Sequence, residues 1–257
     1  MALIKSPNEI KVLREGGQIL ARILSVVASA VRPGVATLEL DELARAEVRK
    51  AGAEAAFPGY RIASTQPPYP AALCTSINNE VVHGIPKKDR ILRGGDIVGL
   101  DLGVKYQGLY TDAALTVPVR RINKDAAKLL NAAKTALDAG IQEIKPGNTL
   151  GDVAEAIETV AKSYSLGVIR DLGGHGVGHA IHEDPFVPNF GRRGNLQTLK
   201  TGMVLAIEPM FTAGGWRIKF LDDGWTVVTA DGSLAAHFEH TVAVTEHGNL
   251  VLTDMEN

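Results

Sequence analysis

Hydrophobic and polar positions along this chain follow two periods, and the changes of period predict where helices and strands lie. A helical pattern over 7–30 starts where Ser6 can cap, Pro7 fits the first helical position and Glu9 completes a capping box. A second helical pattern covers 124–143. Apolar, β-rich runs over 97–117 flank a turn at 105–108, which predicts a hairpin.

The same order of elements occurs twice. Pro-Gly turns at 33–34 and 146–147 each follow a helical pattern and lead into another. Thr37 and Thr149, just after these turns, are predicted to cap the helices that follow. Each half therefore reads as two helices followed by strands, with approximate limits of 7–120 and 124–250.

A second match between the halves involves acidic residues. The stretch 92–101 resembles 199–208, so that Asp101 and Glu208 occupy equivalent positions. Helices outside antiparallel strands, with a pseudo-twofold cleft between the halves, define an α+β fold. The sequence lacks a linker rich in Ser, Gly or Pro, and we expect residues 1–257 to form one domain.

Four carboxylates and one imidazole stand in or beside apolar, strand-like runs: Asp101, Asp112, His175, Glu208 and Glu239. A buried ionised group must be paired or must bind a metal. Four carboxylates close together would repel one another, whereas two divalent cations would neutralise them with the imidazole as a fifth ligand. This balance of charge predicts a two-metal hydrolase.

The register of the hairpin bears on this prediction. If the turn centres between Tyr106 and Gln107, Asp101 and Asp112 lie directly opposite each other with Cβ atoms about 4.5–5.5 Å apart. Such a pair of like charges costs stability unless a cation lies between them. The alternative is that the two residues cap strand ends at a solvated edge.

Histidines supply further candidates. A glycine-rich segment over 171–185 contains His175, His179 and His182, and the glycines permit close approach of a ligand. His83, in a separate loop, has no local signal that distinguishes a catalytic histidine from a structural one. The His-Glu-x-x-His pattern of a zinc helix is absent from the sequence.

Composition and charge exclude further classes of function. The chain has 257 residues, 45% hydrophobic and 22% charged, with a formal net charge of −2. This charge argues against nucleic acid or an anionic membrane as a partner. The sequence shows neither a signal peptide nor an apolar run of about 18 residues, and its single cysteine, Cys74, excludes an internal disulfide. We expect a cytoplasmic protein.

With these residues in view, the whole chain resembles the type I methionine aminopeptidases, metallohydrolases with the pita-bread fold. The resemblance is carried by 79–86, by Asp101 with Asp112, and by the motifs at 174–178, 207–209 and 239–241. It implies a curved antiparallel sheet covered by helices on its outer face. It also implies hydrolysis of the N-terminal methionine from nascent chains and peptides, with preference for a small second residue.

The resemblance implies a role for each candidate. Asp112 and Glu239 would bridge two divalent metals, His175 and Glu208 would complete one site, and Asp101 the other. Glu208 would also move a proton. His83 would contact the scissile amide and His182 the carbonyl oxygen. The methionine pocket would be lined by Tyr60, Cys74, Trp225, Phe57 and Ile181.

Several points stay open at this stage. The segment 61–70 is longer than in the usual bacterial pattern, so either Tyr60 or Tyr69 could reach the pocket. The metals could be Co, Mn, Fe or Zn. Partners would be nascent chains near the ribosome, and the protein is expected to be a monomer. Alternative functions are a proline-directed aminopeptidase or prolidase of the same fold, and a non-catalytic peptide-binding relative.

Overall fold

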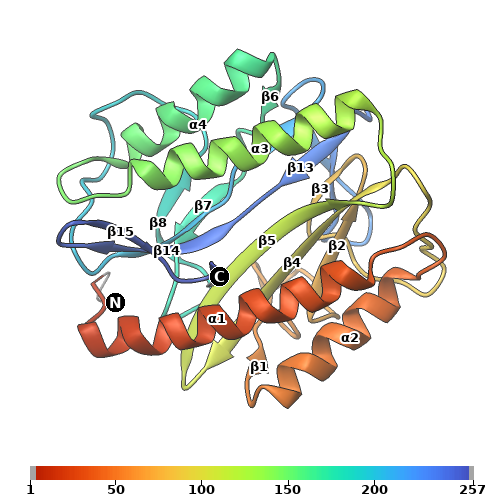
Figure 1. Ribbon diagram of the computed structural model, residues 1–257, viewed down its shortest axis with the longest axis horizontal. Helices are drawn as coiled ribbons and strands as arrows, with labels where there is room; N and C mark the ends of the chain where they lie inside the picture. Colours follow the sequence, from red (N-terminus) through yellow and green to blue (C-terminus); the bar gives the residue numbers. More distant parts are fainter. Residues whose placement is uncertain (1–3, 255–257) are drawn as a thin grey trace.

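Helices cover the outside of the molecule in two pairs. The computed structural model describes residues 4–254. In the view of Figure 1 one helix pair lies above the strands and the other lies below them. Within this range the helices are α1 (Pro7–Ala30), α2 (Thr37–Lys50), α3 (Lys124–Gln142) and α4 (Leu150–Tyr164). The helices predicted over 7–30 and 124–143 are confirmed. The capping box is present too, because Glu9 N donates to Ser6 Oγ at 3.3 Å and Ser6 N donates to Glu9 Oε2 at 2.7 Å.

The strands between the helices form two larger and two smaller antiparallel sheets within the described range. The first larger sheet has the order β1 (Glu54–Ala55), β4 (Ile97–Tyr106), β2 (Leu73–Ile77), and β5 (Leu109–Pro118) also pairs with β4. The second has the order β15 (Gly248–Val251), β14 (His240–Thr245), β9 (Val204–Ile207), β7 (Gly173–Gly176), β8 (Glu183–Pro188). The smaller sheets are β13 (Ala235–His237), β10 (Met210–Thr212), β6 (Gly167–Val168), and β11 (Ile218–Phe220), β12 (Val227–Thr229), β3 (Glu80–Val82).

The hairpin of β4 and β5 is confirmed, but the predicted register is wrong. Asp101 pairs with Ala114 and Asp112 pairs with Gly103, so the two acids are diagonal neighbours on one face. The physical reason is the turn. Gln107 and Gly108 both have positive φ, at 49° and 86°, and form a two-residue loop whose centre lies one residue later than predicted.

The two halves share local geometry at the repeated turns. Gly34 and Gly147 both have φ of 91°, which glycine adopts without a steric penalty. Thr149 caps α4 as predicted, because Asp152 N donates to its Oγ1. The prediction for Thr37 is wrong, since Ala36 occupies the N-cap position of α2. The Thr37 hydroxyl is instead engaged by the backbone of residue 87.

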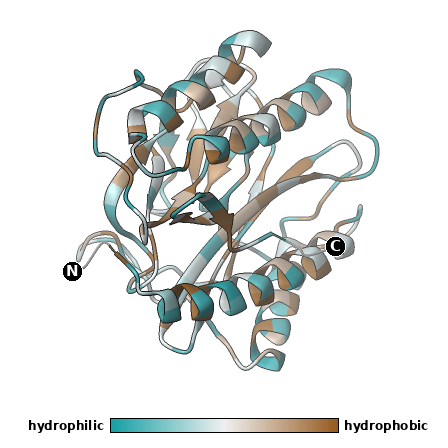
Figure 2. Cartoon of the chain, turned by 60° about the vertical axis from the view of Figure 1, so that its left-hand side comes forward, coloured by the Kyte–Doolittle hydropathy of each residue, from teal (hydrophilic) through white to brown (hydrophobic). Residues whose placement is uncertain are grey.

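Each helix pair covers its own apolar core. Leu20 and Leu24 of α1 pack with Leu100 of β4, and Leu137 of α3 packs with Ile157 of α4. In Figure 2 the brown, hydrophobic sides of the helices turn toward the strands, and the teal sides turn outward. No helix within 4–254 is both long and apolar enough to cross a membrane. That residues 1–257 form one domain stays a prediction.

A backbone bridge joins the two larger sheets. Glu239 N donates to the Ala114 carbonyl at 2.8 Å, and Ala114 N donates to the Glu239 carbonyl at 3.3 Å. Glu239 lies directly before β14 and Ala114 lies on β5, so the bridge connects the second half to the first. We call this bridge the seam, and it lies where the candidate ligands meet.

Candidate metal centre and substrate pocket

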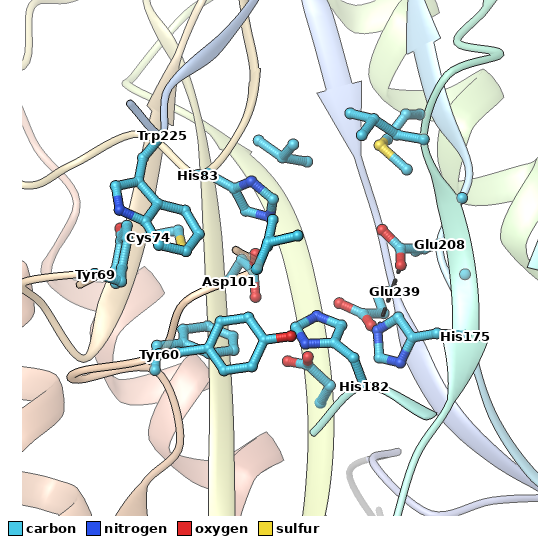
Figure 3. Close-up of a pocket in the computed structure, with 18 of the residues that line it drawn as sticks. Tyr60, Tyr69, Cys74, His83, Asp101, His175, His182, Glu208, Trp225 and Glu239 are labelled. Atoms are coloured by element: carbon cyan, nitrogen blue, oxygen red, sulfur yellow. Dashed lines mark ion pairs between the residues drawn. The ribbon is translucent and has the colours of Figure 1, made fainter. Parts of the chain in front are cut away.

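The five predicted ligands come from both halves and converge at the seam. Asp101 and Asp112 lie on β4 and β5, and His175 lies on β7. Glu208 directly follows β9, and Glu239 directly precedes β14. Figure 3 shows Asp101 facing Glu239, with Glu208 and His175 beyond it. The structure thus brings together residues that are far apart in the sequence.

Distances place the five candidate ligands in two overlapping groups, and a third group joins Asp112 and His175 to His182. One ligand atom from each of Asp101, Asp112 and Glu239 lies within 4.8 Å of the others, and the same holds for His175, Glu208 and Glu239. Glu239 belongs to both groups. Such overlap is the arrangement expected of two adjoining cation sites that share a carboxylate.

The electrostatics of the cluster favour bound cations. Asp101 Oδ1 and Glu239 Oε1 are buried and have no hydrogen-bond partner among the residues that the structure describes. Burial raises the pKa of Asp101 to about 7. Burial, followed by the repulsion of Asp101, raises the pKa of Asp112 well above its ordinary value, and burial followed by Asp112 does the same for Glu239. Unpartnered carboxylate oxygens with raised pKa values are what a site completed by positive charge requires.

His175 is oriented for a role as ligand. Its Nδ1 lies 2.9 Å from the carbonyl oxygen of Gly176, to which it donates in the neutral tautomer. This tautomer leaves the lone pair of Nε2 free, and Nε2 lies 3.6 Å from Glu208 Oε1. Oxygen donors with one imidazole suit Mn, Fe, Co or Zn.

The two candidate catalytic histidines lie on the same cavity. His83 follows β3 with φ of 60°, an uncommon backbone conformation for a non-glycine residue, and its ring is 5.9 Å from that of Trp225. The His182 ring lies 4.4 Å from His175 and 4.8 Å from Tyr60. Desolvation lowers the pKa of His83 to about 4; desolvation followed by the nearby His175 lowers the pKa of His182. The His182 side chain is exposed to solvent, and the lowered pKa values favour the neutral form of both imidazoles.

An apolar pocket opens beside the acids in a cavity of about 370 Å³. Phe57, Tyr60, Cys74 and Trp225 line it, and Ile181 packs in the same apolar cluster. Tyr60 and Tyr69 both line the cavity, and the assignment of these residues to a methionine pocket stays a prediction. Tyr69 is buried with its ring 5.1 Å from Trp225, whereas Tyr60 is partly exposed and adjoins His182.

Sequence reasoning missed several residues at the site. His237 is 4% exposed, and its Nε2, which has no hydrogen-bond partner among residues 4–254, lies 3.4 Å from Glu208 Oε2. Its position two residues before Glu239 was the signal that could have found it, because residues two apart in an extended segment face the same side. The missed side chains that line the cavity are those of Asp171 and the apolar Ile62, Val82, Leu172, Phe186 and Met210.

Comparison with known proteins agrees with this geometry. Residues 11–246 match metallopeptidase family M24. The methionine aminopeptidase of Aquifex aeolicus is 46% identical over 254 residues, which cover 97% of this chain and 98% of that protein. The crystal structure of the methionine aminopeptidase from Thermotoga maritima superposes with a TM-score of 0.94 at 43% identity, covering 98% of this chain and 99% of that one. The prolidase from Pyrococcus furiosus, at 24% identity and a TM-score of 0.75 over 99% of this chain and 66% of that one, shares the fold alone.

The fold and the cluster of acidic ligands define an M24 metallopeptidase of the α+β pita-bread type. The full-length matches at 43–46% identity are more specific. The chain belongs to the type I methionine aminopeptidases of family M24. The predicted family and fold are confirmed, while the role of each site residue stays a prediction.

Proposed function

We propose that this chain hydrolyses the first peptide bond of peptides and nascent proteins that begin with methionine. One observation carries the proposal: a single cavity holds both the acidic ligands and an apolar pocket with a thiol and aromatic walls. A flexible, polarisable thioether side chain packs well against aromatic rings. The scissile bond of a methionine seated there would lie beside the acids.

Asp101, Asp112, His175, Glu208 and Glu239 would hold two divalent ions, with Asp112 and Glu239 shared. Bound ions of this kind supply Lewis acidity and make water a stronger acid. The overlap of the ligand groups at Glu239 supports a count of two. The oxygen-rich donor set is compatible with Co, Mn, Fe or Zn.

The remaining chemistry belongs to the side chains around the acids. As water adds to the carbonyl carbon, Glu208 takes up its proton. His182 donates a hydrogen bond from its neutral ring to the developing oxyanion, and His83 contacts the scissile amide as the amine leaves. The lowered pKa values of both imidazoles support these roles, because a neutral ring offers one N–H donor near pH 7.

Substrate range follows from the outer part of the cavity. Ile62 and Phe186 line it and are 66% and 53% exposed, so they lie where a second residue would pass. We propose that they crowd large second side chains and favour small ones. We also propose that the protein works as a monomer in the cytoplasm, on nascent chains near the ribosome.

Peptide cleavage after chelation and re-metallation tests the activity. The metal-free protein should cleave nothing, and added Mn or Co should restore cleavage of Met-Gly-Met-Met but not of an Ala-Pro peptide. Cleavage of the Ala-Pro peptide instead would favour the proline-directed alternative. Cleavage of neither peptide by the re-metallated protein would favour a non-catalytic peptide-binding relative.

Three variants test the roles of the residues. His83→Ala and His182→Ala should each lower kcat by about 10²–10⁴-fold while metal content is retained. Asp112→Ala should lose metal. His247→Ala, in the exposed turn between β14 and β15, is the matched control and should change neither quantity. Loss of metal in His83→Ala would contradict the assignment of His83 to the substrate.

A further inference from the structure

The segment 178–183 places His182 in the cavity. Its last residue, Glu183, begins β8 and pairs with Gly176 of β7, whereas residues 178–182 lie outside the strands. Gly178 N donates to the Ala180 carbonyl at 3.1 Å, and the Gly178 carbonyl accepts from Tyr110 N at 2.8 Å. The His182 ring is packed against the rings of Tyr60 and His175. Its position therefore depends on the side chains that contact residues 178–182 as well as on the pairing of Glu183 with β7.

A buried ion pair holds the end of this segment. Lys5 is 2% exposed, and its Nζ lies 2.6 Å from Glu183 Oε2. The other carboxylate oxygen, Oε1, accepts from Ala180 N at 2.7 Å. Glu183, the neighbour of His182, thus closes the turn with one oxygen and binds the start of the chain with the other.

The absence of a side chain at Gly178 leaves space for the Lys5 side chain. Gly178 has φ of 142°, and a Cβ atom there would lie 2.4 Å from Lys5 Cε. A side chain at this position would displace the lysine stem. Lys5 is itself fixed, because its backbone N donates to the Gly202 carbonyl at 2.7 Å.

A second contact from the same part of the chain engages the middle of the segment. Glu9 Oε1 lies 2.7 Å from His179 Nε2. The other oxygen of Glu9 accepts from Ser6 N at 2.7 Å within the capping box of α1. The first turn of α1 is thereby connected to the segment three residues before His182.

We propose that Lys5 and Glu9 are positioning residues of the active site, which hold the segment 178–183 and so set the position of His182. This inference rests on the role proposed above for His182. A catalytic group displaced by about 1 Å can lose roughly 10²-fold in rate. The ion pairs of Lys5 and Glu9 are with Glu183 and His179, neither of which is a candidate metal ligand, so they act on the chemistry through the segment.

Three variants separate positioning from simple stability. Lys5→Met should leave the buried Glu183 carboxylate without its cationic partner, which lowers both the melting temperature and kcat. The double variant Lys5→Met/Glu183→Gln removes that unpaired charge and should recover most of the stability. If the contacts of Lys5 and Glu9 position His182, kcat of the double variant should stay about 10–100-fold below that of the wild type, with a smaller change in KM. Glu9→Gln, which keeps a capping side chain, should give a milder loss of kcat.

Hydrogen exchange of the metal-free protein provides a readout independent of activity. Amides of 178–183 should exchange about tenfold faster or more in Lys5→Met and in the double variant, with α3 unchanged. Asn123→Ala, which removes the cap of α3, is the control and should lower stability without affecting kcat or this segment. Unchanged exchange in 178–183, or full recovery of kcat in the double variant, would overturn the proposal. If the wild type cleaves no methionine peptide, the proposed function fails while the exchange experiment still tests the connection.

Discussion

The acidic cluster should make the metal-free protein less stable as pH rises, and Asp101→Asn should remove much of that dependence. The pKa of Asp101 is raised from 3.8 to about 7, first by burial. Between these values the folded state binds more protons than the unfolded state, so stability is lost as pH increases through the window. At about 1.4 kcal/mol per pKa unit, the full shift corresponds to roughly 4 kcal/mol.

Urea denaturation of chelated protein at pH 5 and pH 8 measures this effect. Between these two pH values the wild type should lose about 3 kcal/mol relative to Asp101→Asn, as an upper figure because Asp112 and Glu239 share protons with Asp101. At pH 8 the variant should therefore be the more stable protein.

Asp41 is a buried carboxylate whose oxygens have hydrogen-bond partners, so we expect its replacement to lower the stability of the protein. Asp41 is 2% exposed, its Oδ1 accepts from Ala72 N and Leu73 N, and its Oδ2 lies 2.7 Å from Arg45 Nε. Asp41→Asn should destabilise the protein at both pH values by about 1–3 kcal/mol. If Asp101→Asn also destabilised the metal-free protein at pH 8, or if its effect were the same at both pH values, the electrostatic account of the cluster would be refuted.

Two further outcomes follow from packing and from the site. Gly17→Ala should lower the free energy of unfolding in urea by about 1–3 kcal/mol, because the new Cβ would lie 2.3 Å from the Leu252 carbonyl oxygen. Gly16→Ala should lower it less, because its Cβ would lie 3.2 Å from the nearest atom. Equal effects of the two variants would contradict this reasoning. His237→Leu should weaken metal binding by about 10–100-fold in calorimetric titration, because the imidazole faces Glu208, whereas His237→Gln, which retains a donor, should bind nearly as the wild type does. Equal affinity in both variants would remove His237 from the site.

Local signals were sufficient for the helices but not for the strand register. Ser6, Pro7 and Glu9 act within one turn of α1, so the sequence alone shows where that helix begins. The hairpin register depended on Gln107 adopting positive φ, which its residue type does not favour. The prediction for Thr37 failed for a related reason. Its hydroxyl contacts residue 87, fifty positions away, and no local pattern records that contact.

The convergence of the five candidate ligands could be predicted from the sequence, but the residues around them could not; that the five bind metal stays a prediction. Charged side chains in apolar runs are conspicuous, and the family resemblance then related five distant residues to one another. His237 was missed because a single histidine in a strand is ordinarily a packed core residue. The apolar lining, such as Met210 and Phe186, becomes visible only when strands from both halves lie side by side.

The location of the ligands at the seam links metal binding to the association of the halves. The first half supplies Asp101 and Asp112, the second supplies the other three, and Glu239 carries both a ligand oxygen and the backbone bridge to Ala114. Neither half alone can complete a group that contains Glu239 and Asp112. Ions held by these residues would bind the folded arrangement and not the separated strands, so their binding free energy would add to the stability of the seam. Metal would then relieve the same repulsion between carboxylates that is expected to weaken the metal-free protein.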